Sequence, residues 1–312
     1  MDLSRVSVVL PCLNEALTLK SVIEQIRAIS HDIEIVVVDN CSTDDSYAIA
    51  LGMGVKVLKE SKKGKGFAVR RGFSSINIQC EVVVLIDSDD TYSLSNLKKA
   101  IELVVENKYD MVVGTRVEEV IDSKARSKTF RAGHGVGNLV FSKISQVLHP
   151  SGVVDSLSGF RVMSRNFIES FTGGASEFEI EAELNAHAAF INTSVANIDV
   201  KYKGRPIGSE SKLRTFRDGY KILRFNFRIF RTYRPKAAYS LIAVLWLLVA
   251  ISLGIDPILV YFETGLVPRF PSLIAAVGAL IVSVQLWNTG VILERIKVAH
   301  LSQVKSAYKS LG

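Results

Sequence analysis

The sequence predicts an α/β domain with a mostly parallel sheet, followed by a hairpin of two membrane-spanning helices. Three observations lead to this prediction. Short β-branched apolar runs alternate with helical patterns through the first third of the chain, as is typical of a parallel sheet covered on both faces. Two long C-terminal runs contain no charged residue, and a basic, aromatic segment precedes them.

The elements of the domain are expected in a regular order at first. Runs rich in Val and Ile predict strands over residues 6–10, 33–38, 55–58, 82–86 and 111–113. Helical spacing of apolar residues predicts helices over 17–29, 44–51, 66–75 and 95–106. Later the pattern is less regular, and it predicts helices over 131–148 and 177–190, strands over 159–163 and 194–202, and a loop over 204–211.

The two uncharged runs have the length and composition of membrane spans. They cover residues 237–255 and 270–293, and the first extends to about residue 262 if Asp256 is included. A helix needs about 20 apolar residues to cross roughly 30 Å of hydrocarbon. Two buried helices of a soluble core are the alternative, which the run lengths and the basic flank disfavour.

A basic segment, residues 212–236, lies just before the first run. It holds nine Lys or Arg against Asp218, so its net charge of +8 exceeds the +7 of the whole chain. Aromatic and basic side chains form two adjacent stripes at helical spacing, which favours an amphipathic helix in the headgroup plane. The alternative is a helix whose aromatic stripe packs on the domain. Such a local belt favours anionic lipids as partners and argues against nucleic acid.

The same asymmetry predicts the orientation in the membrane. Basic residues lie on the outer flanks of both runs, whereas the loop between them holds Arg269 alone. Under the positive-inside rule both flanks face the cytoplasm. The predicted organisation is therefore a cytoplasmic domain over 1–211, a juxtamembrane helix over 212–236, a transmembrane hairpin over 237–293 and a basic cytoplasmic tail over 294–312, in a bacterial inner membrane or its equivalent. No signal peptide is expected, and the three cysteines are expected to be reduced thiols without a catalytic role.

Asp87 and Asp89 directly follow the apolar run 82–86. In extended backbone, residues two apart point to the same side, so both carboxylates are expected to face one point. They repel each other unless a cation lies between them, and their hard oxygens favour Mg²⁺ or Mn²⁺ shared with substrate phosphates. Because Asp-x-Asp also occurs in ordinary acidic loops, the position after a buried strand carries the metal prediction.

Polar residues also follow the second strand. Asp39 ends that strand and is expected to accept hydrogen bonds from a base or ribose, since ligands of such sheets bind beyond the carboxyl ends of the strands. Ser42 and Thr43 follow in the next turn, and capping of the next helix by Ser42 or Thr43 is expected.

Two further turns lead from a strand or loop into a helix. The first is Pro11-Cys12-Leu13-Asn14-Glu15, where Glu15 is either a binding residue or only a favourable charge at a helix N-terminus. The second is Gly64-Lys65-Gly66, which would let backbone N–H groups and Lys65 approach a phosphate.

Together these motifs resemble those of family 2 glycosyltransferases with the GT-A fold, a Rossmann-like, mostly parallel sheet. The order and spacing of Pro11-x-x-Asn14-Glu15, Val38-Asp39-Asn40-x-Ser42-x-Asp44, Gly64-Lys65-Gly66 and Asp87-x-Asp89 carry the resemblance. The later Asp155-x-x-Ser158-Gly159-Phe160-Arg161 and Phe178-Glu179-Ile180-Glu181 are similar to the subgroup of dolichol-phosphate mannose synthase and bacterial polyprenyl-phosphate glucosyltransferases. Asp90 departs from the family pattern, which has an apolar residue or Gly after Asp-x-Asp.

The resemblance implies transfer of one sugar from a nucleotide-sugar donor to a polyprenyl phosphate, with Mg²⁺ or Mn²⁺ as cofactor. By similarity, Asp87 and Asp89 hold the metal, Asp89 and Asp155 are the catalytic residues, and the donor is bound by Pro11, Asn14, Glu15, Asp39, Lys65 and Asp87. The acceptor phosphate is expected near Arg116, Arg131, Asn138, Arg161, Arg205 and Lys212. Since a phosphate acceptor is already anionic, Asp155 is expected to orient a substrate rather than to act as a base.

UDP-glucose is the favoured donor, and GDP-mannose and a UDP-N-acetylhexosamine stay open. Two other readings also stay open: a catalytically inactive, membrane-tethered protein that binds nucleotide sugars, and a nucleotidyltransferase built on the same kind of sheet. A homo-oligomer is neither predicted nor excluded.

Overall fold

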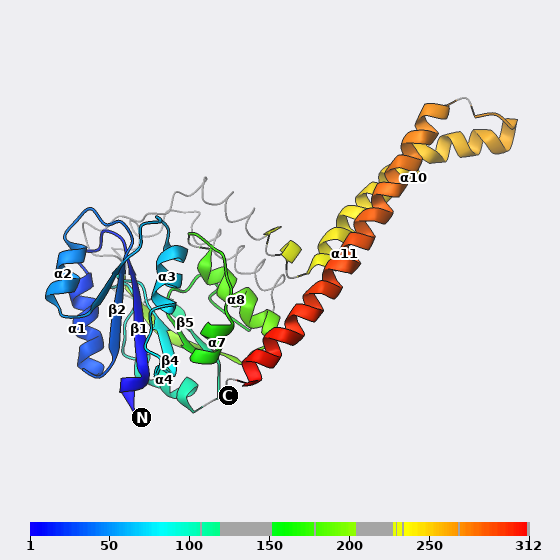
Figure 1. Cartoon of the computed structure of the whole chain (residues 1–312). Coiled ribbons are helices and arrows are strands. Elements are labelled where there is room, and N and C mark those ends of the chain that lie inside the picture. The colour runs from blue at the N-terminus through cyan, green and yellow to red at the C-terminus, as the bar shows by residue number, and fades with distance from the viewer. Residues whose placement is uncertain are drawn as a thin grey trace. The chain divides into compact units, whose positions relative to one another are not determined.

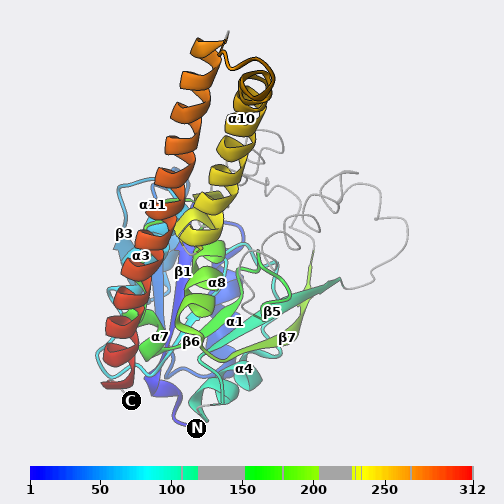
Figure 2. The same ribbon diagram turned by 90° about the vertical axis from the view of Figure 1, so that its right-hand side faces the viewer.

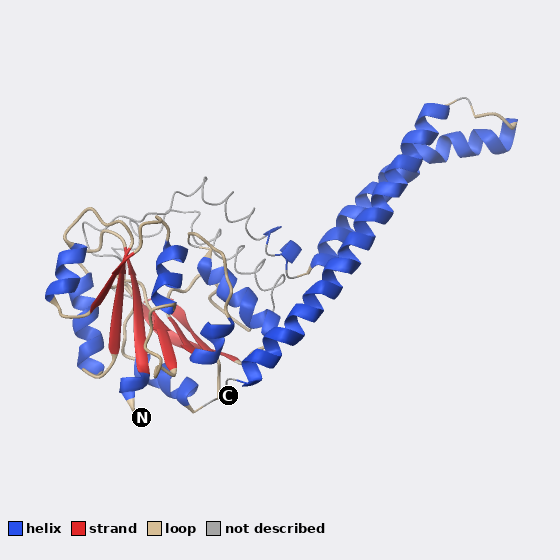
Figure 3. Ribbon diagram, viewed as in Figure 1, coloured by secondary structure: helices blue, strands red, loops and turns tan. Residues whose placement is uncertain are grey.

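The computed structural model describes residues 1–106, 108–118, 152–177, 179–203, 227–228, 230–232, 234–267 and 269–310. It confirms the predicted α/β domain, whose seven strands form one sheet in the order β3-β2-β1-β4-β6-β5-β7. Helices lie on both faces of this sheet (Figures 1 and 3). The chain divides into two compact units, and a hairpin within Arg224–Lys305 forms the second.

The elements of the sheet domain largely follow the predicted order. They are the 3₁₀ turn η1 (Leu3–Arg5), β1 (Val6–Cys12), α1 (Leu19–Ile29), β2 (Glu34–Asp39), α2 (Ser46–Gly52), β3 (Lys56–Lys59), α3 (Lys65–Phe73), β4 (Val82–Leu85), α4 (Leu97–Val105), β5 (Met111–Glu118), β6 (Arg161–Ser164), α7 (Arg165–Ser170), α8 (Ile180–Ile191) and β7 (Val195–Tyr202). Helix α7 was not predicted. It begins where the Ser164 hydroxyl accepts a hydrogen bond from the backbone N–H of Phe167, which caps a short apolar segment.

Strand direction places several strand ends at one edge of the sheet. Strands β3, β2, β1 and β4 are mutually parallel, whereas β6 runs antiparallel to both β4 and β5. The register pairs Cys12 of β1 with Asp39 of β2, and Val9 of β1 with Leu85 of β4. The segments that follow β1, β2 and β4 therefore leave the sheet side by side, where parallel α/β sheets bind ligands.

The alternation of side chains along β1 divides the core into two layers. Val8 and Leu10 belong to a cluster that includes apolar residues of α1 and α4, whereas Val9 points to the other face, against Gly72 of α3. A side chain at Gly72 would lie within 2.3 Å of Val9, so the glycine lets α3 approach the sheet closely. Because α3 packs closely on the sheet here, its first residue, Lys65, lies near the strand ends.

The C-terminal unit is a pair of long helices, α10 (Pro235–Thr264) and α11 (Phe270–Ser310), which run side by side (Figure 2). Both are long and apolar enough to cross a bilayer, by length and composition. Small residues such as Ala243, Ala250 and Ala279 are buried between them, while large apolar side chains such as Leu245 are more than half exposed. The Ser283 hydroxyl donates to the Ala243 carbonyl across the pair at 2.8 Å. This inside-out distribution is typical of helices packed in lipid.

Both helices extend beyond the predicted spans. Pro257 lies inside α10, and Figure 1 shows that helix bent toward its C-terminal end, as expected where proline removes a backbone hydrogen bond. Helix α11 runs without interruption through most of the predicted tail, so at 1.5 Å per residue it is about 60 Å long, roughly twice the hydrocarbon thickness. The predicted helix 131–148 and most of segment 212–236 lie outside the described residues.

Candidate active site

The ends of β1, β2 and β4 bring together the first group of predicted residues. Pro11 lies at the end of β1 beside Val38 of β2, and Asp39 is the last residue of β2. The Asp87–Asp89 loop follows β4 shortly after its last residue, Leu85. The shared edge comes from the parallel register and not from nearness in sequence.

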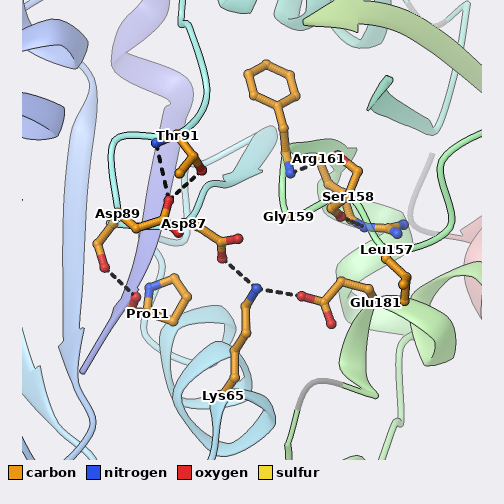
Figure 4. A network of polar contacts seen from close by, with 12 residues as sticks. Pro11, Lys65, Asp87, Asp89, Thr91, Leu157, Ser158, Gly159, Arg161 and Glu181 are labelled. Carbon is orange, nitrogen blue, oxygen red and sulfur yellow. Dashed lines mark hydrogen bonds and ion pairs between the residues drawn. The ribbon is translucent and has the colours of Figure 1, made fainter. Parts of the chain in front are cut away.

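Hydrogen bonds to the backbone fix the Asp87–Asp89 loop. The Ser88 hydroxyl donates to the Pro11 carbonyl at 2.8 Å, and the Thr18 hydroxyl donates to the Ser88 carbonyl at 2.7 Å. Asp89 is almost fully buried, and its Oδ1 accepts hydrogen bonds from the hydroxyl and the backbone N–H of Thr91, at 2.6 and 3.3 Å. The loop is therefore tied to β1 and α1, and its two carboxylates have different partners (Figure 4).

Lys65 lies between two carboxylates, Asp87 and Glu181 (Figure 4). Its Nζ is 2.5 Å from Asp87 Oδ1 and 2.5 Å from Glu181 Oε1. Burial acts against the charged form of the lysine, but the two neighbouring carboxylates outweigh it and raise the Lys65 pKa above its usual range. For Glu181, burial is the largest effect and raises the carboxyl pKa, although Lys65 opposes it. The ammonium group thus already places a positive charge against the predicted metal ligand Asp87.

The glycines on either side of Lys65 have a different role from the predicted one. The backbone N–H of Gly66 donates to the carbonyl of Ser176 at 3.1 Å, so it does not point toward a phosphate. A Cβ at Gly64 would lie 2.1 Å from the Ser176 carbonyl oxygen, and one at Gly66 would lie 2.2 Å from that of Ala175. The glycines let the start of α3 pack against the backbone before α8, which brings Lys65 close to Glu181.

Gly159 approaches Asp87 as closely as Gly64 and Gly66 approach their neighbours. A Cβ at this position would lie 2.2 Å from Asp87 Oδ2 and 2.6 Å from its Cγ. The backbone N–H of Gly159 donates to the buried hydroxyl of Tyr92 at 2.9 Å, which holds the segment before β6 in place. The absence of a side chain at Gly159 therefore leaves room for the Asp87 carboxylate.

Asp155 and Arg116, which were predicted to have separate roles, form a bidentate ion pair. Arg116 Nε lies 2.6 Å from Asp155 Oδ2, and Arg116 NH2 lies 2.8 Å from Oδ1. The Arg116 guanidinium also lies 5.4 Å from the centre of the Tyr202 ring. Since this geometry fixes both side chains, Asp155 is held in one orientation by Arg116.

Arg161 is a correction to the sequence prediction. Its side chain is fully buried, and its guanidinium donates to Asn185 Oδ1 at 2.6 Å and to the Ser158 carbonyl at 3.1 Å. Burial lowers the Arg161 pKa to about 10. A guanidinium buried and engaged in this way does not contact an acceptor phosphate, so we assign Arg161 to holding the segment before β6 against α8.

The turn after β1 interlocks with the turn after β2. The side-chain oxygen of Asn14 accepts a hydrogen bond from the N–H of Thr43 at 2.7 Å, and the N–H of Asn14 donates to the Ser42 hydroxyl at 3.0 Å. Glu15 is buried, and its backbone N–H donates to the Ser46 hydroxyl at 2.8 Å. Asn14 has a φ of 54°, a left-handed conformation that asparagine tolerates well.

Helix α2 begins at Ser46, after Asp45, so the predicted capping by Ser42 or Thr43 is wrong. The backbone N–H of Ser42 donates to Asp39 Oδ1 at 3.3 Å, and Asp39 is buried. Pro11, Asn14, Glu15 and Asp39 therefore form one connected edge, as a nucleoside site would require.

Asp90, the departure from the family pattern, has a clear structural reason. Its φ is 55°, a conformation that favours Gly, Asn or Asp. Its carboxylate accepts hydrogen bonds from the Ser21 hydroxyl at 3.0 Å and the Gln25 amide at 2.7 Å. Asp90 thus anchors the Asp87–Asp89 loop to α1.

The carboxylates fit a divalent cation that shares its coordination with a substrate. Asp87 and Asp89 supply hard oxygen ligands, and the Lys65 contact shows that Asp87 already attracts a positive charge. Among the described residues, no three His, Cys, Asp or Glu side chains are grouped to hold a metal without help. Phosphate oxygens of a ligand would have to complete such a site.

Four predicted acceptor residues, Arg131, Asn138, Arg205 and Lys212, lie outside the described residues.

In the sequence, Glu181 stands out only as part of the motif Phe178-Glu179-Ile180-Glu181. The structure buries Glu181 against Lys65, whereas a carboxylate oxygen of Glu179 accepts the N–H of Glu177 at 3.1 Å. The signal that could have identified Glu181 is its place between apolar residues at a helix start, where a carboxylate needs a partner.

Comparisons with known proteins agree with this fold. Residues 7–171 match the family model described as glycosyl transferase family 2. Glycosyltransferase AglJ of Haloferax volcanii is 27% identical over 96% of this chain and 96% of its own length. A dolichyl-phosphate hexose transferase of the same organism is 29% identical over 69% of this chain and 90% of its own length.

A solved structure shares the fold. It is glucosyl-3-phosphoglycerate synthase from Mycobacterium tuberculosis, in complex with Mn²⁺, UDP-glucose and phosphoglyceric acid. It has a TM-score of 0.56 and 22% identity, and the match covers 73% of this chain and 79% of that one. The family match spans more than half of the chain and includes the strand ends and the Asp87–Asp89 loop. This chain therefore belongs to glycosyl transferase family 2.

Proposed function

We propose that this protein transfers one sugar from a nucleotide diphosphate donor to the phosphate of a membrane polyprenol, with UDP-glucose as the first donor to test. The observation that carries the proposal is a cation-attracting carboxylate, Asp87, at the carboxyl edge of the sheet, in a chain with two helices long enough to span a bilayer. Membership of the family supports sugar transfer. The relative named as a dolichyl-phosphate hexose transferase supports a lipid phosphate as the acceptor.

The donor would bind along the edge that joins β1, β2 and β4. Asp87 and Asp89 would hold Mg²⁺ or Mn²⁺, and such an ion supplies charge neutralisation for a diphosphate leaving group. Lys65 already lies at Asp87 and is close enough to take part in binding the same diphosphate. The nucleoside is proposed to contact the interlocked turns, through Pro11, Asn14, Glu15 and Asp39.

The acceptor would meet the sugar near the Arg116–Asp155 pair. A phosphate monoester is ionised at neutral pH, so its oxygen attacks the anomeric carbon without losing a proton to the protein. Attack from the face opposite the departing diphosphate inverts the configuration at that carbon. Asp155, held by Arg116 at 2.6 and 2.8 Å, is proposed to orient the acceptor or sugar. The phosphate itself is proposed to contact Arg116, Arg131, Asn138, Arg205 and Lys212.

The membrane arrangement follows from charge. The segment 212–236 and the end of α11 are basic, whereas the loop between α10 and α11 has little positive charge. We propose that both termini and the sheet domain are cytoplasmic and that the basic flanks bind anionic lipids. A donor made in the cytosol and a lipid acceptor would then meet on the same side of the bilayer.

The test uses the purified full-length protein with Mn²⁺, radiolabelled nucleotide sugars and undecaprenyl phosphate. We expect a chloroform-soluble labelled product that is absent with undecaprenol, which lacks the phosphate. Asp89→Asn should reduce its formation at least about 100-fold, as expected for loss of a group that stabilises charge in the transition state. A matched control is Asp32→Asn, which changes an exposed carboxylate before β2 at the opposite edge of the sheet.

Three results would contradict the proposal. Label that stays only in the aqueous phase would exclude a lipid acceptor. Release of pyrophosphate when a nucleoside triphosphate and a sugar 1-phosphate replace the nucleotide sugar would instead indicate a nucleotidyltransferase. Tight binding of every donor without turnover would indicate an inactive binding protein.

A further inference from the structure

Among the described residues, Glu181 has one carboxylate oxygen that accepts no hydrogen bond. The residue is 3% exposed, and its Oε1 lies 2.5 Å from Lys65 Nζ. Within the described part of the chain, the other oxygen, Oε2, is buried and has no hydrogen-bond partner. It is the only buried side-chain nitrogen or oxygen atom of which this is true among the described residues. A buried acceptor on a charged group is costly to leave unsatisfied, so this atom calls for an explanation.

The position of this oxygen relates it to the donor site. Lys65 Nζ contacts Glu181 and Asp87 at the same distance of 2.5 Å, so a single ammonium group separates the two carboxylates. Asp87 is proposed to face the donor diphosphate through a metal ion. The sugar is bonded directly to that diphosphate, so a carboxylate that only one ammonium group separates from Asp87 is near enough to reach the sugar of a donor bound there. Figure 4 shows Glu181 reaching toward Lys65 from the opposite side to Asp87.

The surrounding charges select the kind of group that Oε2 would bind. Lys65 already contributes one cation to Glu181. A second buried cation, Arg161, has its guanidinium donating to Asn185, one turn further along α8, and to the Ser158 carbonyl. A neutral O–H donor satisfies Oε2 without adding a further charge beside these two. Sugar hydroxyls are such donors, and their hydrogen bonds to a carboxylate are among the stronger ones.

We propose that Glu181 binds a hydroxyl group of the donor sugar through Oε2 and so helps to determine which sugar is accepted. This inference rests on the proposed function, because it requires a nucleotide-sugar donor at Asp87. Glu181 is then a binding and specificity residue for the donor. Its Oε1 keeps Lys65 in place at the diphosphate, and its Oε2 reads the sugar.

The first test needs no variant. The nucleotide sugar that binds wild-type protein is identified by calorimetry with Mn²⁺ present, among UDP-glucose, GDP-mannose and UDP-N-acetylglucosamine. Its monodeoxy analogues, each lacking one hydroxyl, are then titrated. At least one analogue should bind about 10- to 100-fold more weakly, because a site built around a hydroxyl is left with an unpaired polar group. Binding of all analogues within about threefold of the parent donor would overturn the inference.

The second test uses Glu181→Gln, which keeps an acceptor for Lys65 and can place an N–H₂ group where Oε2 was. We expect this variant to lose about 10- to 100-fold in affinity for the sugar donor, to bind the sugar-free nucleoside diphosphate like wild type, and to stop discriminating against the critical deoxy analogue. Glu179→Gln, which changes the neighbouring glutamate that accepts the Glu177 N–H, should behave like wild type. Equal weakening of sugar donor and free diphosphate would show that Glu181 acts through Lys65 alone, and would overturn the inference. If wild-type protein binds no nucleotide sugar, both the proposed function and the inference fail.

Discussion

Replacing Gly159 by alanine tests whether the position of the Asp87 carboxylate matters for metal and donor binding. The new Cβ would lie 2.2 Å from Asp87 Oδ2, 2.6 Å from its Cγ and 3.0 Å from Oδ1. Ordinary contacts of a Cβ begin near 3.4 Å. The backbone of Gly159 is not in the left-handed region, so alanine can adopt it. The carboxylate, at the end of a flexible side chain, must therefore move while the backbone stays in place.

The size of the effect follows from the distance that the carboxylate must move. Restoring an ordinary contact requires a shift of about 1 Å, and misplacing a catalytic group by that amount costs about 100-fold in rate. Stability should change by less than about 1 kcal/mol, because alanine also reduces the freedom of the unfolded chain and this offsets the loosened Lys65–Asp87 contact. Gly159→Ala should thus give a folded protein with about 100-fold lower kcat/KM and weaker Mn²⁺ binding.

The assay combines Mn²⁺ titration by electron paramagnetic resonance, the lipid-product assay and thermal unfolding of wild-type and variant protein. Gly52→Ala is the matched control: Gly52 is the last residue of α2, and a Cβ there would meet nothing within 4 Å. That control should retain full activity and gain up to about 1 kcal/mol of stability. A folded Gly159→Ala protein with wild-type metal affinity and activity would refute the reasoning, because Asp87 would then tolerate displacement.

Four further predictions follow from named contacts. Lys65→Met leaves the Asp87 and Glu181 carboxylates without their shared cation, so it should lower the free energy of unfolding by about 3 kcal/mol. Mn²⁺ should then raise the Tm of this variant more than that of wild type, and an equal shift in Tm for the two proteins would contradict this. Asp90→Ala loses two hydrogen bonds at a φ of 55° and should cost about 2 kcal/mol in urea unfolding, whereas Asp90→Gly, which suits that φ, should cost less. Burial lowers the His187 pKa to about 4, so the unfolded chain takes up a proton near pH 6.5 while the folded one does not; stability should therefore fall as pH drops from 6.5 to 4, by up to about 3 kcal/mol, and His187→Gln should flatten this dependence. Finally, burial raises the Cys12 pKa to about 11, so in the folded protein at pH 8 a maleimide should label exposed Cys41 and spare Cys12, as mass spectrometry can check.

The strands of the first half could be predicted because strong local patterns coincide with the tertiary structure. The run before Asp39 is apolar on both faces, as a central parallel strand requires, and it appears as β2. The antiparallel position of β6 between β4 and β5 could not be predicted, because pairing depends on contacts between distant segments. Helix α7 was missed because it is a single short segment whose start depends on one capping hydroxyl, that of Ser164.

The candidate site divides in the same way. Residues at strand ends, such as Asp39 and Asp87, were identified because strand position predicts where a side chain emerges. The partner of Lys65 and the burial of Arg161 were not, since both depend on how α8 packs against α3 and β6. The glycines of Gly64-Lys65-Gly66 were expected to let backbone N–H groups approach a phosphate, but their close approach to Ala175 and Ser176 gives them a packing role.

Charge balance connects Lys65 with the proposed metal ion and with product release. Asp87 and Glu181 share one lysine, so the resting cluster carries a net negative charge in a largely buried place. A divalent cation and a nucleotide-sugar diphosphate would neutralise each other, so together they would enter this cluster without adding net charge. The nucleoside diphosphate product carries one more negative charge than the donor, and with the same cation it leaves an excess beside two carboxylates. At the proposed site, the cluster would therefore favour the metal–donor complex over the metal–product complex, which is the direction that product release requires.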